Sequence, residues 1–214
     1  MSRPVTGMSL RHADQAGQTA PGSGPALVPW LELVVGAQPQ RPAVIEGDQV
    51  WSYRDLWNRA GRIAAGLLER GTAGQHARVG LVGRNSAEYL AAYLGILRAG
   101  HVAVPLNFML KPADLLDHLA LARADCCILG DIDGDTASAI ADAVDAPAIA
   151  DVYGASDRPL PAIGPQAEAS LLPTSGSTGA PKGVLLTHGT IAHAALELAI
   201  AFPCGRDEVS ICFL

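Results

Sequence analysis

Residues suited to binding an anion gather in one short stretch of the chain, residues 174–183. Hydroxyl side chains alternate there with glycines, and a single lysine follows a proline. Glycine lets the backbone turn successive N–H groups toward one anion. Short hydroxyl side chains donate further hydrogen bonds, and lysine adds a mobile positive charge. The stretch therefore predicts a phosphate-binding loop. The residues expected to contact the phosphates are Thr174, Ser175, Gly176, Ser177, Thr178, Gly179 and Lys182.

A flexible linker and the common nucleotide-binding loop each share features with this stretch, but neither fits it. A Gly/Ser linker has a similar composition, but here apolar runs bound the stretch on both sides and a Pro-Lys-Gly turn interrupts it. The common nucleotide-binding loop places Ser or Thr directly after its lysine, whereas Gly183 follows Lys182 in this chain. The sequence thus favours a nucleotide site of a different class.

Residues 174–183 resemble the phosphate loop of the adenylate-forming superfamily. This superfamily includes the acyl- and aryl-CoA synthetases, the adenylation domains of nonribosomal peptide synthetases and firefly luciferase. Residues 51–56 and 96–107 resemble two earlier motifs of the same superfamily, in the same order. The resemblance covers nearly everything after the N-terminal 25 residues. It implies that the loop residues named above bind the β- and γ-phosphates of ATP.

The resemblance also implies an activity. ATP would activate a carboxylic acid, fatty or aryl, to an acyl-adenylate, and CoA would then take the acyl group. Asn107 leans toward the acyl-CoA synthetases, because peptide synthetases more often carry Asp there. The resemblance implies Mg²⁺ as a further requirement of the full enzyme. Two alternatives stay open, namely the front part of a peptide-synthetase adenylation domain and a non-catalytic nucleotide-binding or interaction fragment.

The catalytic residues of the superfamily are expected beyond Leu214, so none is assigned in this chain. Removing one strong donor from such a site commonly costs on the order of 100-fold in rate. We therefore expect the 214-residue chain alone not to adenylate acids. Residues 209–214 are apolar and β-prone, which predicts an open sheet edge and a chain that is either unstable alone or completed by a partner chain.

Composition excludes several classes of function. The net charge of −6 argues against a nucleic-acid binder, and no apolar run is long enough to span a bilayer. No metal site is predicted, because Cys126 and Cys127 are adjacent and His188 and His193 do not face each other on a helix. Free thiols suit a reducing, cytoplasmic location.

The chain pattern predicts an α/β fold, a parallel-stranded sheet with flanking helices, which the resemblance identifies as an incomplete N-terminal domain of the adenylate-forming fold. Residues 1–25 are predicted to be a disordered tail, and residues 26–214 to be the partial AMP-binding domain. Strands are predicted at 76–82, 102–104, 126–129, 148–150 and 184–186. Helices are predicted at 26–36, from a capping box at 52–55 to Gly71, from a cap at Asn85 with Glu88 to Gly100, and at 112–123, 136–144 and 190–202. A hairpin is predicted at 43–51.

Overall fold

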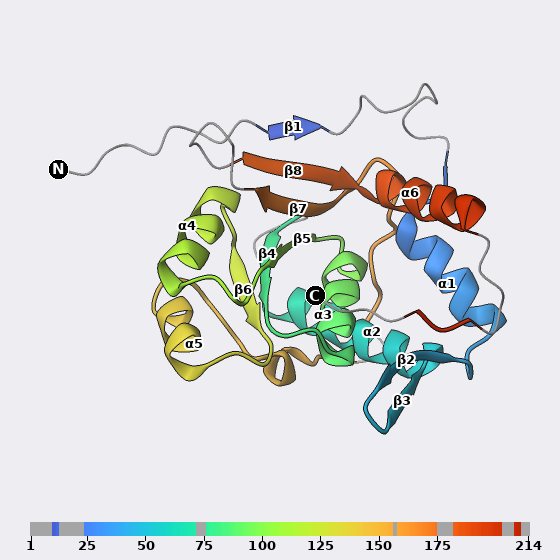
Figure 1. Cartoon of the computed structure of the whole chain (residues 1–214), viewed down its shortest axis with the longest axis horizontal. Coiled ribbons are helices and arrows are strands. Elements are labelled where there is room, and N and C mark those ends of the chain that lie inside the picture. The colour runs from blue at the N-terminus through green and yellow to red at the C-terminus, as the bar shows by residue number, and fades with distance from the viewer. Residues whose placement is uncertain are drawn as a thin grey trace.

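The computed structural model describes residues 24–71, 76–155, 158–174, 182–202 and 208–210, together with the backbone of residues 10–12. Its centre is a six-stranded sheet with the order β1-β8-β7-β5-β4-β6 (Figure 1). The strands are β1 (Leu10–His12), β4 (Arg78–Val82), β5 (Val102–Leu106), β6 (Cys126–Leu129), β7 (Glu168–Thr174) and β8 (Lys182–Thr187). Strands β6, β4, β5 and β7 are parallel, and β8 is antiparallel to β7. The predicted α/β fold is confirmed.

Helices cover both faces of this sheet, as Figure 1 shows. They are α1 (Leu27–Ala37), α2 (Tyr53–Glu69), α3 (Ala87–Arg98), α4 (Pro112–Ala122), α5 (Gly134–Ala141) and α6 (His188–Ala201). A separate antiparallel hairpin joins β2 (Pro42–Glu46) to β3 (Gln49–Ser52) and leads directly into α2.

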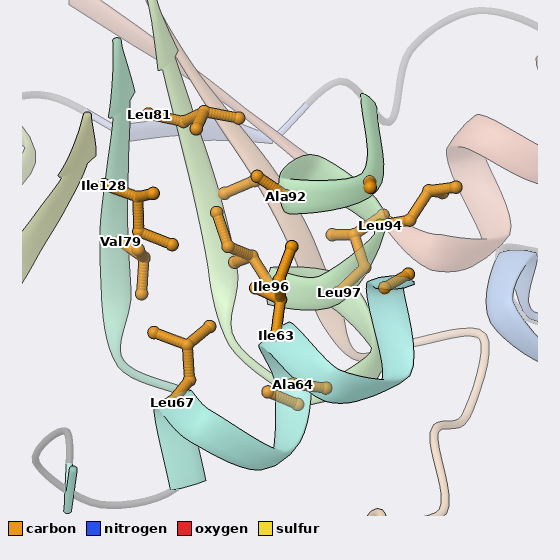
Figure 2. Packing of buried hydrophobic residues seen from close by; sticks show 14 of the residues in the cluster. Ile63, Ala64, Leu67, Val79, Leu81, Ala92, Leu94, Ile96, Leu97 and Ile128 are labelled. Carbon is orange, nitrogen blue, oxygen red and sulfur yellow. The ribbon is translucent and has the colours of Figure 1, made fainter. Parts of the chain in front are cut away.

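Alternation along the strands divides the core into two clusters. Val79, Leu81 and Ile128 pack with α2 and α3 on one face, whereas Val82 and Leu129 pack with α4 and α5 on the other. Successive side chains of a strand point to opposite faces, so a sheet buried on both faces needs continuous apolar strands. Figure 2 shows the first cluster, with Ile63 of α2 beside Ile96 and Leu97 of α3. Leu67 of α2 lies on the side of the sheet strands that carry Val79 and Ile128. The side chains drawn there with labels are Ile63, Ala64, Leu67, Val79, Leu81, Ala92, Leu94, Ile96, Leu97 and Ile128.

Local signals in the sequence explain the start of α2. The Ser52 Oγ accepts a hydrogen bond from the Asp55 N–H at 3.1 Å, and the Asp55 carboxylate accepts one from the Ser52 N–H at 3.0 Å. This reciprocal pair is the predicted capping box, and it is confirmed. Gly71 and Gly100 adopt positive φ angles of 67° and 75° just after α2 and α3, where the chain must leave the helix.

The predicted cap of α3 is wrong by one residue. The N-cap is Ser86, not Asn85, and its Oγ accepts a hydrogen bond from the Tyr89 N–H at 3.0 Å. Glu88 takes no part in the cap and instead accepts hydrogen bonds from Arg59 and from the Tyr153 hydroxyl. Because α3 begins at Ala87, the hydroxyl of Ser86 is the one in reach of the free N–H groups of the first turn.

The strand predicted at 148–150 is also wrong, because Ile149–Val152 form a 3₁₀ helix. The backbone carbonyls of Asp145 and Pro147 accept hydrogen bonds from the N–H groups of Cys127 and Leu129 of β6, and Ala148 forms one isolated bridge to Leu129. Pro147 has no N–H to donate, so a continuous ladder cannot form beside β6.

Two terminal predictions have different outcomes. Strand β1 lies within the predicted tail and pairs with β8 in parallel. Most other residues of that tail lie outside the described ranges, so the division at residue 25 stays a prediction. Residues 208–210 lie in no strand, and the remaining residues of the strand predicted at 209–214 are outside the described ranges.

Candidate functional site

The two ends of the predicted phosphate loop lie side by side at the end of a β-hairpin. Thr174 is the last residue of β7, Lys182 is the first residue of β8, and the two are register partners. The Thr174 hydroxyl donates a hydrogen bond to the Lys182 carbonyl oxygen at 3.3 Å. The structure thus brings together the first and last of the predicted phosphate-binding residues. The remaining predicted residues lie outside the described ranges, and they are Ser175, Gly176, Ser177, Thr178 and Gly179.

The strand that carries Thr174 is fixed in the sheet. Ser170 of β7 is register partner of Ala103 in β5, and its hydroxyl donates a hydrogen bond to the Ala103 carbonyl at 3.2 Å. Ala169 and Leu171 are fully buried on either side of it. Thr174, three residues further, is exposed and Lys182 is half-buried. The buried part of β7 therefore fixes the backbone only a few residues before the exposed, polar Thr174.

The loop begins at the carboxyl edge of the parallel strands. β4, β5 and β6 end at the same edge, since all three run in the direction of β7. In open α/β sheets, ligands bind outside the carboxyl ends of the strands. The position of Thr174 therefore matches the place where such a sheet offers its ligand site.

Polar residues that the sequence pattern did not single out also lie at this edge. Arg84 follows β4, and its Nε is 3.6 Å from the Asp131 carboxylate, which follows β6. The Arg84 guanidinium lies 5.1 Å from the centre of the Phe108 ring, which follows β5. Both charged side chains are largely exposed, so the ion pair contributes little to stability. In the sequence, these residues are marked only by their position shortly after a buried strand.

The hairpin distinguishes this loop from the common nucleotide-binding loop. There a helix begins directly after the loop, so that its N-terminus faces the phosphates. Here β8 follows Lys182, and α6 begins at His188, at the other end of β8. Any positive charge offered to phosphate at the described ends of the loop therefore comes from the Lys182 side chain rather than from the α6 dipole.

The buried cysteines and His188 are poor candidates for catalysis. Burial raises the pKa of both the Cys126 and the Cys127 thiol to about 12, so both stay protonated at neutral pH. His188 is fully buried, burial lowers its pKa to about 4, and neither ring nitrogen has a hydrogen-bond partner among the described residues. The sequence pattern argued against these residues as metal ligands, but it did not predict the complete burial of His188.

Neither a metal site nor a membrane span is found in the parts of the chain that the structure describes. Those parts contain no group of three or more His, Cys, Asp or Glu side chains able to hold a metal ion. None of the helices in the described ranges combines the length and the apolar character needed to cross a membrane.

Comparisons with known proteins agree on one family. Residues 31–214 match the family model described as AMP-binding enzyme. The chain is 37% identical over 179 residues to a probable non-canonical nonribosomal peptide synthetase, CymA, of Salinispora arenicola, covering 84% of this chain and 2% of CymA. It is 34% identical over 183 residues to feruloyl-CoA synthase of an Amycolatopsis species, covering 84% of this chain and 37% of that enzyme.

A solved structure confirms the fold assignment. VinN in complex with L-aspartate superimposes with a TM-score of 0.76 at 26% sequence identity, and the match covers 87% of this chain and 50% of VinN. The chain therefore spans half of VinN and a smaller part of both curated relatives.

Proposed function

The chain belongs to the AMP-binding enzyme family, and we propose that it holds the phosphates of ATP in an enzyme that activates a carboxylic acid as an acyl-adenylate. The observation that carries this proposal is the Thr174–Lys182 register pair, which holds together the two ends of a loop rich in Gly, Ser and Thr. We assign the phosphate contacts to Thr174, Ser175, Gly176, Ser177, Thr178, Gly179 and Lys182. The unit that carries the site is proposed to be residues 26–214, preceded by residues 1–25 as an N-terminal tail, of which β1 pairs with β8.

The proposed reaction is a displacement at the α-phosphorus of ATP. The carboxylate oxygen of the acid forms the new bond, the bond from the α-phosphorus to the bridging oxygen breaks, and pyrophosphate leaves. Negative charge grows on the departing pyrophosphate. A lysine and hydroxyl donors at the β- and γ-phosphates stabilise that charge most when they are positioned beforehand. Lys182, whose backbone is fixed by the pairing of β8 with β7, fits this role.

The described residues do not form a site for Mg²⁺, since no suitable cluster of carboxylates and imidazoles is present among them. No step is therefore assigned to a metal. The contribution of this chain is binding and charge stabilisation by the loop.

Two acceptors for the acyl group are proposed, each with its own support. The similarity to feruloyl-CoA synthase and the presence of Asn107 support CoA. The similarity to CymA and to the antimetabolite synthetase AmbB of Pseudomonas aeruginosa, 37% identical over 188 residues, supports a carrier domain. Either acceptor suits a cytoplasmic location, which the free, buried Cys126 and Cys127 also support.

Lys182→Ala in the 214-residue chain tests the binding role. Loss of one charge-assisted contact is expected to weaken ATP binding by roughly 10- to 100-fold. Lys111→Ala is the matched control, because Lys111 is the other lysine of the chain and lies exposed at the start of α4. Isothermal titration with ATP measures both. Equal affinities for wild type and Lys182→Ala would contradict the assignment.

Acid-dependent exchange of pyrophosphate into ATP tests the reaction. We predict that the polypeptide isolated from its source cells catalyses exchange with either an aryl acid or an amino acid, and that addition of CoA distinguishes the two acceptors. The 214-residue chain by itself is predicted to bind ATP without exchange. Exchange by that chain would overturn the second prediction but would leave the first standing.

A further inference from the structure

A cavity of about 820 Å³ lies at the amino-terminal edge of the sheet. It is lined by residues that precede three parallel strands: His76 two residues before β4, His101 directly before β5 and Ala167 directly before β7. The end of α2 and the connecting segment 158–163 form the other walls. A cavity of this volume falls within the usual range of small-molecule sites, roughly 300–1,000 Å³.

Most of the wall is apolar. Leu68 of α2, Ala99 at the end of α3, and Leu160 and Ile163 of the connecting segment contribute aliphatic side chains. The connecting segment also packs closely against the turn between α3 and β5. A Cβ on Gly100 would lie 3.1 Å from the Pro161 Cγ. The cavity is therefore bounded by a closely packed segment on one side and by the sheet edge on the other.

Cationic and polar groups lie where this apolar wall meets solvent. Arg158 carries a permanent positive charge and is exposed, and the described part of the chain records no ion pair for it. His76 is also exposed and belongs to the same lining, and its φ angle of 71° is uncommon for a residue other than glycine. Such backbone conformations are more frequent at functional sites than elsewhere.

Charge separates the inner end of the cavity from its rim. His101 is 1% exposed, and both the negative charge of Asp125 and the neighbouring His76 act on it. The Asp125 carboxylate accepts a hydrogen bond from the Arg78 N–H at 2.8 Å and is held in place. An anion is therefore disfavoured beside His101 and favoured beside Arg158. This distribution suits a ligand with an apolar body and a single anionic head.

We propose that this cavity binds an amphipathic carboxylate, with its hydrocarbon chain against Leu68, Ala99 and Leu160 and its carboxylate beside Arg158 and His76. The site is separate from the proposed nucleotide site. β7 runs from Glu168, next to the cavity, to Thr174, at the loop, and its seven residues span roughly 20 Å. An acid bound here cannot reach the phosphates at Thr174, so it is not the acid that is activated.

Isothermal titration of the 214-residue chain with sodium decanoate, kept below its micelle concentration, tests the proposal. Saturable binding with one site is expected. Octanoate, shorter by two methylene groups, is expected to bind on the order of tenfold more weakly, because each buried methylene contributes about 0.8 kcal/mol. 1-Decanol, which lacks the negative charge, is expected to bind about fivefold more weakly.

Two variants locate the ligand, each with a matched control. Ala162→Trp places a large side chain on the cavity lining and is expected to abolish decanoate binding. Gln166→Trp, at an exposed position four residues further along the chain and off the lining, is not expected to do so. Arg158→Gln is expected to weaken binding about fivefold, and Arg54→Gln, an exposed arginine of α2, leaves it unchanged. Circular dichroism of every variant verifies the fold.

Several outcomes would overturn the proposal. Absence of saturable decanoate binding to the wild-type chain is one, and undiminished binding to Ala162→Trp is another. Loss of decanoate binding in Lys182→Ala would place the acid at the nucleotide site instead. Since decanoate binding is measured without ATP, failure here leaves the proposed function untouched.

Discussion

The α2–α3 pair and α6 are both rich in apolar residues, yet only the pair is buried. Ile63, Leu67 and Ile96 are 0% exposed (Figure 2). In α6 the described buried residues are His188 and Ala192, both near its start, and every residue from 193 to 202 is exposed. Leu198 and Ile200 are 61% and 67% exposed. An apolar period therefore predicts a helix equally well in both places, but it does not say whether another element covers the helix.

The composition of the two outer faces shows the same contrast. The solvent side of α2 carries Arg54, Asn58 and Arg59. Residues 193–201 of α6 include only His193 and Glu197 as polar side chains, 3.9 Å apart. A helix that is apolar nearly all round is normally buried, and exposed apolar surface of this kind promotes association. Burial of the α2–α3 pair therefore stabilises the fold, whereas the outer half of α6 buries little surface against the described part of the chain.

The largest expected difference in the free energy of unfolding is between truncating one leucine of the α2–α3 pair and truncating one leucine of α6. Leu67→Ala removes a fully buried side chain and is expected to lower the free energy of unfolding by about 2–5 kcal/mol. Leu198→Ala is expected to change it by less than about 0.5 kcal/mol, because the side chain is 61% exposed. Urea denaturation followed by circular dichroism measures both. A loss of more than about 2 kcal/mol in Leu198→Ala would show that α6 is covered after all.

The pH dependence of stability probes the point where α6 meets the core. Burial lowers the pKa of His188 to about 4, whereas an unfolded histidine titrates near 6.5. Between these pH values the unfolded chain binds the additional proton, so this contribution to stability is present above pH 6.5 and is lost as the pH falls toward 4. The loss amounts to about 3 kcal/mol.

His188→Leu isolates that contribution, because leucine is apolar and does not titrate. Urea denaturation gives the free energy of unfolding of wild type and variant at each pH between about 4 and 6.5. The difference between their two slopes against pH reports the titration of His188. Identical slopes would show that His188 is hydrated and that the start of α6 is as open as its outer half.

At two glycines, substitution by alanine is expected to change the free energy of unfolding in opposite directions. A Cβ on Gly66 of α2 would lie 1.5 Å from the Val152 carbonyl oxygen, a backbone atom that cannot move alone. Gly66→Ala is therefore expected to cost roughly 1–3 kcal/mol. No atom of the described part of the chain lies within 4 Å of the same position on Gly36 of α1, so Gly36→Ala is expected to stabilise the helix by about 0.5–1 kcal/mol. Thermal unfolding of the two variants measures the reversal, and a stabilised Gly66→Ala would contradict the close packing.

Much of the fold could be predicted from local signals. The capping box at Ser52, the glycine ends of α2 and α3 and the parallel strands β4, β5 and β6 each follow from residues close together in the sequence. The two wrong predictions also have local physical causes. Pro147 lacks the donor for a ladder, and Ser86 rather than Asn85 precedes the first helical residue.

Only part of the candidate phosphate site could be predicted, because its geometry does not follow from local signals alone. The positions of Thr174 and Lys182 depend on which strands become neighbours, and the pairing of β7 with β8 confirms only that the two ends of the loop meet. The phosphate contacts themselves stay a prediction. The burial of His188 and the cavity beside Arg158 could not be foreseen, because both depend on contacts between segments far apart in the chain.

The smallest effect compares the caps that start a helix in each region. The Ser86 Oγ accepts a hydrogen bond from the Tyr89 N–H at 3.0 Å, and the Thr187 Oγ1 accepts one from the Thr190 N–H at 3.1 Å. Ser86→Ala is expected to cost about 1 kcal/mol of global stability, because α3 unfolds only with the core around it. Asn85→Ala, which removes the side chain that the sequence predicted as the cap, is expected to cost little.

Thr187→Ala loses an equivalent hydrogen bond, but its consequence is expected to be local. The outer half of α6 makes few buried contacts in the described structure, so it can fray without opening the sheet. Hydrogen exchange should therefore quicken at residues 193–201 while the midpoint of global unfolding moves by less than in Ser86→Ala. Equal shifts of both midpoints would mean that α6 and α3 unfold as one cooperative unit. The contrast between the two regions would then be one of surface exposure, and not of stability.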